Sequence, residues 1–366
     1  MKHMTEYRDP ELAQQYLQEI KNTVTRKWTI MEVCGGQTHS LVKNGILDLL
    51  PDEVNMVHGP GCPVCVTPVN MIDKAIHLAE DKDVILCSFG DMLRVPGSKK
   101  SLLEAKAGGA DIRILYSPME AISLAAKMPE REIVFFAVGF ETTAPANALS
   151  VVQAHKMGIK NYSILTSHVL VPPAIEALMS DPECVVEGFL AAGHVCTIMG
   201  VEEYAPLVEK YKVPIVVTGF EPVDILQGIY MVVKQLEDGY AKLENQYTRV
   251  VRTKGNPQAI DMIHKVFDTS DRMWRGLSVI PNSGYSVSEG YADYDAIRKF
   301  DITIEHSPEN AECIAGDIMK GISKPFDCPN FGTKCKPETP LGAPMVSSEG
   351  ACAAYYHYSS ATTASA

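Results

Sequence analysis

The sequence predicts an α/β protein with parallel sheets, followed by a smaller loop-rich region. Between about residues 28 and 240, short runs of β-branched and apolar residues alternate with helical patterns, which is typical of parallel strand–helix–strand units. After about residue 245, clear strand patterns become rare, and glycine, proline and cysteine recur along the chain. We therefore expect residues 245–366 to form a separate domain that is held together by something other than a large apolar core.

Individual elements can be assigned in order along the chain. Residues 10–22 predict a helix, because Pro10 suits a first helical turn and apolar side chains recur on one face. A strand follows at about 28–33. The later runs that predict strands are 55–59, 83–89, 111–117, 132–140, 162–167 and 214–220. The helical patterns between and after them include 69–82, 143–158 and 256–267.

One helix boundary carries a clear signal. After the strand at 111–117, Ser117 can act as the N-cap and Pro118 fits the first helical position. Glu120 stands where it would complete a capping box with Ser117. The sequence therefore predicts a helix that begins at Pro118.

Composition excludes several classes of protein. The chain carries 33 Lys and Arg against 45 Asp and Glu, and a net charge of −12 argues against binding to a nucleic-acid backbone. No stretch approaches the roughly 18 apolar residues of a membrane span, and the N-terminus lacks the apolar segment of a signal peptide. We therefore expect a cytoplasmic protein without nucleic-acid or membrane partners. In that reducing compartment, the ten cysteines predict metal ligands or redox thiols.

Four cysteines near the C-terminus form one candidate metal site. Cys313, Cys328, Cys335 and Cys352 have the spacing C-x14-C-x6-C-x16-C. Four thiolates suit an iron–sulfur cluster or a structural zinc, and this spacing does not select between them. Four unrelated buried thiols are a third interpretation. The glycine- and proline-rich sequence around these cysteines would leave backbone N–H groups free to donate to cluster sulfurs.

A second candidate site lies near the N-terminus, in the segment MEVCGGQTHS. Cys34 follows a strand and precedes two glycines that allow close backbone approach, at the start of a helix whose N-terminus would lower the thiol pKa. His39 lies five residues further on and could orient, protonate or ligate a group at that sulfur. The alternative is a buried cysteine that only packs, which does not explain the two glycines.

Cys62 and Cys65 form a CxxC motif in the loop HGPGCPVCVTP. Such pairs form disulfides reversibly, which predicts a redox-active site. Half of a zinc site is the main alternative, although the sequence has no second CxxC and only Cys34 could contribute. The remaining cysteines and two isolated histidines are expected to be structural: Cys87, Cys184, Cys196, His168 and His194. The sequence contains no phosphate-binding or dinucleotide-binding motif.

Ligands of open α/β sheets bind beyond the carboxyl ends of the strands. Cys34, the glycine-rich loop at 59–61, Glu141 and Glu221 all follow predicted strands. The two glutamates belong to similar Gly-Phe-Glu turns, which indicate either an internal duplication or two like turns in one sheet. We expect these loops to share a cleft.

Several motifs together closely resemble the HypD family of scaffold proteins in [NiFe]-hydrogenase maturation. They are CGGQTH, GPGCPVC, FGDMLRVPGS, VGFETTAPA, TGFEPVDIL and PLGAPMVSSEGACAAYYHY, and they extend from about residue 28 to residue 358. The resemblance implies two similar α/β domains around a cleft and a third domain with a [4Fe-4S] cluster. It assigns the cluster ligands to Cys313, Cys328, Cys335 and Cys352. The domains are expected at 28–117, 118–244 and 245–366, with a helix in 1–27 that packs on the C-terminal domain.

The resemblance also implies a role. In this family the cysteine of CGG and the CxxC pair face the cleft where the iron of an Fe(CN)2CO group is assembled, and these roles fall on Cys34, Cys62 and Cys65. We expect Cys34 to hold iron jointly with a thiol of the small partner HypC, and HypE to deliver cyanide. The cluster is expected to pass electrons toward the CxxC pair. The chain would then be a redox-capable assembly scaffold, and a monomer because no long heptad surface is visible.

Two other functions would use the same residues. An iron–sulfur-dependent thiol-disulfide reductase would need no iron from a partner, and a zinc-stabilised interaction module would contain zinc without sulfide. The chain also departs from many members of the family at Ala315 and Pro344, where they carry cysteine. Neither position belongs to the four-cysteine spacing, so the departure affects only an accessory thiol role.

Overall fold

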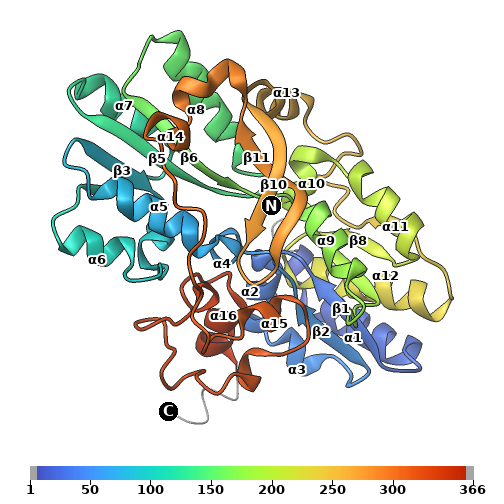
Figure 1. Ribbon diagram of the computed structural model, residues 1–366. Coiled ribbons are helices and arrows are strands. Elements are labelled where there is room, and N and C mark those ends of the chain that lie inside the picture. Colours follow the sequence, from blue (N-terminus) through green and yellow to red (C-terminus); the bar gives the residue numbers. More distant parts are fainter. Residues whose placement is uncertain (1–5, 360–366) are drawn as a thin grey trace.

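The computed structural model describes residues 6–359. Two parallel sheets lie side by side with helices on their faces, and a hairpin and a loop-rich C-terminal region pack against them (Figure 1). This arrangement confirms the predicted parallel-sheet α/β class. Within the described part of the chain, no helix combines the length and apolar character that crossing a membrane requires.

The first sheet has the strand order β2-β1-β7-β8-β9, and all its neighbouring strands are parallel. Its strands are β1 (Trp28–Glu32), β2 (Val54–His58), β7 (Gly188–Ala192), β8 (Ile215–Thr218) and β9 (Leu243–Asn245). The helices around it are α1 (Pro10–Thr23), α2 (Gly35–Lys43), α3 (Ile46–Leu49), α9 (Val171–Ser180), α10 (Gly193–Met199), α11 (Ala205–Tyr211) and α12 (Pro222–Glu237).

The second sheet has the order β4-β3-β5-β6 and is also parallel throughout. Its strands are β3 (Val84–Ser88), β4 (Ile112–Ile114), β5 (Glu132–Gly139) and β6 (Tyr162–His168). Its helices are α5 (Val69–Ala79), α6 (Leu102–Ala107), α7 (Pro118–Lys127), α8 (Ala144–Lys156), α13 (Pro257–Val266) and α14 (Ala296–Lys299), and α4 (Pro63–Val66) leads into it from the first sheet. Single 3-10 turns are η1 (Glu6–Arg8), η2 (Gly90–Arg94), η3 (Glu202–Tyr204) and η4 (Glu289–Tyr294).

The sheets do not follow the expected division of the chain at residues 117 and 118. β1 and β2 share one sheet with β7, β8 and β9, whereas β3 to β6 form the other sheet. The first sheet is therefore built from two separate stretches of chain, and the expected boundary falls inside the second. Local hydrophobic patterns identify strands but do not say which strands pair, so the sequence could not reveal this crossing.

The N-terminal helix also differs from expectation. α1 packs mainly on α12, where the rings of Tyr16 and Tyr230 lie 6.1 Å apart and Ile20 is fully buried. Its apolar face completes the core around the first sheet rather than covering the C-terminal domain. Asp9 caps its N-terminus by accepting the Glu11 N–H at 2.9 Å.

Only part of the C-terminal stretch is loop-rich. α13 and the antiparallel hairpin of β10 (Phe267–Trp274) and β11 (Ser278–Val287) pack on the second sheet, and they share its apolar core through Ile263, Phe267 and Tyr285. The later region has short elements: α15 (Ala315–Met319), η5 (Pro325–Asp327), η6 (Ala343–Met345) and α16 (Ala351–Tyr358). The unit expected at 245–366 is therefore not separate from the α/β body.

Candidate functional site

Two glycine-containing loops interlock at the carboxyl end of the first sheet. Cys34 follows β1 as the N-cap residue of α2, and Gly61 follows β2. The Gly35 N–H donates to the Gly61 carbonyl at 2.9 Å. A Cβ atom at Gly61 would lie 2.2 Å from the Cys34 nitrogen, so only glycine permits this approach. The close backbone approach predicted for the glycines after Cys34 is confirmed at Gly35, where an added Cβ atom would lie 2.7 Å from the Glu349 carbonyl oxygen.

The Cys34 thiol is buried beside an imidazole. Its Sγ lies 3.7 Å from Nδ1 and 3.8 Å from Nε2 of His194, which follows β7, and the side chain of Cys34 is 1% exposed. Burial raises the pKa of the Cys34 thiol, and the N–H groups of Gln37 and Gly36 lower it by less. The expectation that the helix N-terminus would leave a depressed thiol pKa is therefore wrong.

His194 is the histidine at this sulfur. Burial lowers its pKa from 6.5 to about 4, so the ring is neutral near pH 7 and can ligate a metal. It stacks on Phe220 with centroids 5.2 Å apart. His39 points elsewhere, with Nδ1 3.0 Å from the Ser348 carbonyl oxygen. Sequence reasoning assigned His194 a structural role, although its place after a strand end was a usable signal.

A buried polar chain connects the Cys34 loop with α16. Glu32 is fully buried in β1, and its Oε2 accepts the Cys34 N–H at 2.9 Å. Its Oε1 accepts the Thr38 hydroxyl and lies 2.7 Å from His58 Nδ1. The other ring nitrogen of His58 lies 2.9 Å from the Tyr355 hydroxyl. Sequence reasoning missed Glu32 and His58, whose signal was a charged residue inside an otherwise apolar strand.

The CxxC cysteines form a disulfide in the structure. Cys62 caps α4, and Cys62 and Cys65 are only 4% and 2% exposed. They share an apolar core with Cys34. A small pocket beside the disulfide is lined by Thr38 and Glu349 among others.

The four C-terminal cysteines line one pocket. Its walls include Cys313, Cys328, Cys335 and Cys352. The Leu341 N–H donates to Cys335 Sγ at 3.3 Å, the kind of bond expected from the surrounding sequence. Among the described residues, no three Cys, His, Asp or Glu side chains approach closely enough to hold a single metal ion.

The four-cysteine pocket and the disulfide pocket are neighbours. Ile318 and Pro344 line both of them. Ala315 lines the four-cysteine pocket as well. Pro344 therefore lies at the wall between the cysteine groups, and Ala315 lies in the wall of the four-cysteine pocket but not of the disulfide pocket.

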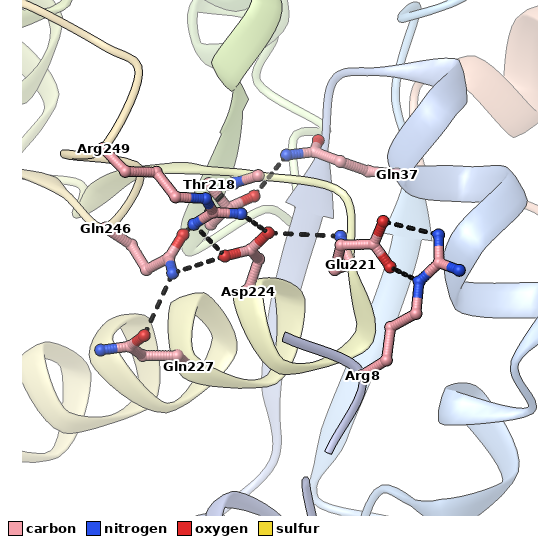
Figure 2. Close-up of polar contacts among 9 residues, drawn as sticks. Arg8, Gln37, Thr218, Glu221, Asp224, Gln227, Gln246 and Arg249 are labelled. Carbon is pink, nitrogen blue, oxygen red and sulfur yellow. Dashed lines mark hydrogen bonds and ion pairs between the residues drawn. The ribbon is translucent and has the colours of Figure 1, made fainter. Parts of the chain in front are cut away.

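Polar contacts brace the strand end behind His194. Asp224 in the first turn of α12 is fully buried and accepts two hydrogen bonds from the Arg249 guanidinium, at 2.7 and 2.6 Å (Figure 2). Gln37 in α2 donates to the Thr218 hydroxyl at 2.6 Å, which ties α2 to β8 (Figure 2). These contacts fix the segment that carries Phe220.

The two Gly-Phe-Glu turns lie at different sheets. Glu221 stands at the edge of the first sheet with Cys34, where it pairs with Arg8 (Figure 2). Glu141 follows β5 of the second sheet, where its buried carboxyl group accepts the Val171 N–H at 2.9 Å. The loops after β1, β2, β7 and β8 meet at the first sheet, and the loop after β5 also reaches its core, because Phe140 packs in the same apolar cluster as Cys34 and Cys62.

Comparison with known proteins decides the family. The family model described as "HypD: Hydrogenase formation hypA family" matches residues 11–359. The chain belongs to the HypD family. It is 46% identical to the hydrogenase maturation factor HypD of Azotobacter vinelandii, over 98% of this chain and 97% of that protein. It is also 46% identical to HypD of Rhodobacter capsulatus over the full length of both, and 43% identical to HypD of Escherichia coli over 98% of each.

Membership in the HypD family confirms the resemblance drawn from the motifs. The HypD segments CGGQTH and GPGCPVC are the two loops that interlock at the first sheet, and the C-terminal segment supplies α16 and Cys352. The HypD motifs thus converge on one region although they are far apart in the sequence.

Proposed function

We propose that this chain is a hydrogenase maturation factor, a redox-capable scaffold on which the Fe(CN)2CO group of [NiFe]-hydrogenase is assembled with HypC and HypE. Its relatives in Azotobacter vinelandii and Escherichia coli are named hydrogenase maturation factors, which supports the general role. The observation that carries the proposal is the meeting of Cys34, the Cys62–Cys65 disulfide and the four-cysteine pocket in adjoining parts of the molecule.

Cys34 is proposed to hold the iron cargo together with a thiol of HypC. A soft thiolate suits an iron atom that carries cyanide. Because the buried thiol keeps its proton at neutral pH, iron binding must release that proton. His194 is neutral and lies 3.7 Å from the sulfur, so its ring is placed to ligate the same iron, whereas its lowered pKa prevents it from keeping the released proton at pH 7.

Cys313, Cys328, Cys335 and Cys352 are proposed to bind a [4Fe-4S] cluster. All four thiols line one pocket, and among the described residues no three of them approach closely enough to hold a single metal ion, which favours a cluster over a single zinc ion. The Leu341 N–H at Cys335 fits a sulfur ligand that needs hydrogen bonds. When bound, the cluster would supply single electrons. Reducing the Cys62–Cys65 disulfide to two thiols takes two electrons and two protons.

The alternative is a reductase that acts on the disulfide of another protein. It would use the same cysteines without iron cargo. The disulfide is buried, so a protein substrate could not reach its sulfurs without opening this part of the fold. Burial therefore favours the scaffold, in which a small metal group is enclosed.

Replacing Cys34 by alanine tests the proposal. In the complex purified with HypC-type and HypE-type partners, the variant should lose the infrared bands of iron-bound cyanide and CO and keep its iron–sulfur content. Cys87→Ala is the matched control, because Cys87 is equally buried but lies in β3 of the second sheet, and it should keep the bands. Bands that persist in Cys34→Ala would contradict the assignment.

Iron and acid-labile sulfide, measured on anaerobically purified chain, test the cofactor separately. About four irons and four sulfides per chain are expected, and Cys328→Ala should lose them. Zinc without sulfide would remove the electron source and with it the redox part of the proposal.

A further inference from the structure

The turn between β10 and β11 places one arginine between the two cysteine groups. The Arg275 N–H donates to the Val66 carbonyl at 2.9 Å, one residue after Cys65. Its guanidinium Nη2 donates to the Pro96 carbonyl at 3.0 Å. The residue is only 4% exposed. A cationic side chain is therefore held deep inside, next to the CxxC loop.

The charge of Arg275 lacks a close partner of its own. Its Nε has no hydrogen-bond partner, and no carboxylate among residues 6–359 lies within 4.0 Å of its guanidinium. Glu309 and Asp73 exert a weaker attraction from farther away. A guanidinium stays charged in proteins, and burying it without a counter-charge costs free energy. The structure therefore holds a positive charge for which its described residues give no adequate compensation.

Arg275 also borders the four-cysteine group. It lines a cavity of about 260 Å³ together with Cys313, Ala315 and Gly342. The same three residues line the four-cysteine pocket. The unpaired positive charge thus lies beside one of the four proposed ligands.

We propose that Arg275 is the counter-charge of the iron–sulfur cluster and raises its reduction potential. This inference rests on the proposed function. A cluster held by four thiolates is negatively charged, and reduction adds one electron without making or breaking a bond. A fixed positive charge nearby favours the more negative, reduced form, and low-dielectric surroundings strengthen the effect.

Redox titration with dithionite, followed by electron paramagnetic resonance on the full chain, tests this positioning role. Arg275→Gln should lower the midpoint potential by 59 mV or more, a tenfold change in the one-electron reduction equilibrium. Arg272→Gln is the matched control. Arg272 lies on the same hairpin and donates to the Tyr285 carbonyl, but lines neither pocket at the cysteines, so its loss should leave the potential unchanged.

Arg275→Lys keeps the proposal testable if the glutamine variant loses its cluster. Lysine loses its proton at a pKa of about 10.4 or lower when buried, whereas arginine does not. The potential of the lysine variant should match the parent at neutral pH and fall below it as pH rises. Identical potentials in both at every pH, or no shift in an intact Arg275→Gln cluster, would overturn the inference. A parent chain without any cluster would instead refute the proposed function.

Discussion

Glu141 is a buried acid whose protonation should control stability. Burial raises its pKa from 4.5 to about 8, and its Oε2 has no partner among the described residues. The unfolded chain releases this proton near pH 4.5 and the folded chain only near 8, so stability is lost as pH rises across that window. Glu141→Gln should therefore gain on the order of 4 kcal/mol over the parent by pH 8, measured by urea unfolding from pH 5 to 9.

The equivalent glutamate of the other turn gives the control for Glu141. Glu221 is partly exposed and paired with Arg8. Glu221→Gln should follow the pH dependence of the parent. A constant difference between Glu141→Gln and the parent at all pH values would contradict a protonated, buried carboxyl group.

Gly61 sets the contact between the Cys34 loop and the CxxC loop. Because an added Cβ would meet the Cys34 backbone at 2.2 Å, Gly61→Ala should force the loops apart and lower the free energy of unfolding by about 2 kcal/mol or more. Gly290 has open space around its Cβ direction, so Gly290→Ala should be neutral. Equal stability of the two variants, by thermal unfolding, would show that the loops can separate without cost.

Residue-level prediction from sequence succeeded where a motif combined unusual residue types. The cysteine spacing and the glycines after Cys34 were visible in the sequence. The roles of three further residues were not predicted, because they depend on side chains from β1, β2 and α10 that meet only after folding. These residues are Glu32, His58 and His194. A lone histidine or glutamate carries no such information by itself.

Among the elements, α12 depends on a buried ion pair at its first turn. Arg249→Met would leave Asp224 charged and fully buried without its main partner. The expected loss is about 3 kcal/mol of unfolding free energy, because an uncompensated buried charge is expensive. Chemical denaturation measures it. Arg8→Met removes the exposed pair at the same edge and should leave stability unchanged; similar losses in both variants would show that burial does not set the cost.

Element-level prediction was accurate for apolar strands and capped helices. β5 and β6 match the runs predicted at 132–140 and 162–167. α7 begins at Pro118 as expected, but Glu120 accepts the N–H of Tyr116 instead of closing a box with Ser117. The strands β10 and β11 were missed because many of their side chains are polar and exposed, which hides the alternating pattern.

At the scale of the molecule, the sequence predicted parallel sheets but not their membership. β1 and β7 pair although more than 150 residues separate them. Pairing between strands so far apart depends on how the whole chain packs, and no local sequence pattern predicts it. The site depends on the pairing of β1 with β7, since Cys34 follows β1 and His194 follows β7.

The loop-rich stretch from about residue 305 to 342 should depend on the proposed cluster for its order. It contains only α15, of five residues, and the three-residue turn η5 as regular helices, and few of its side chains belong to the large apolar cores. Cluster ligation would therefore supply much of its stability. In hydrogen exchange, Cys328→Ala should exchange faster across this stretch, while β1 and β5 stay protected by their buried sheets. Unchanged exchange across residues 305–342 would show that this stretch stays ordered without the cluster. Equal acceleration in both sheets would show that the cluster stabilises the whole fold.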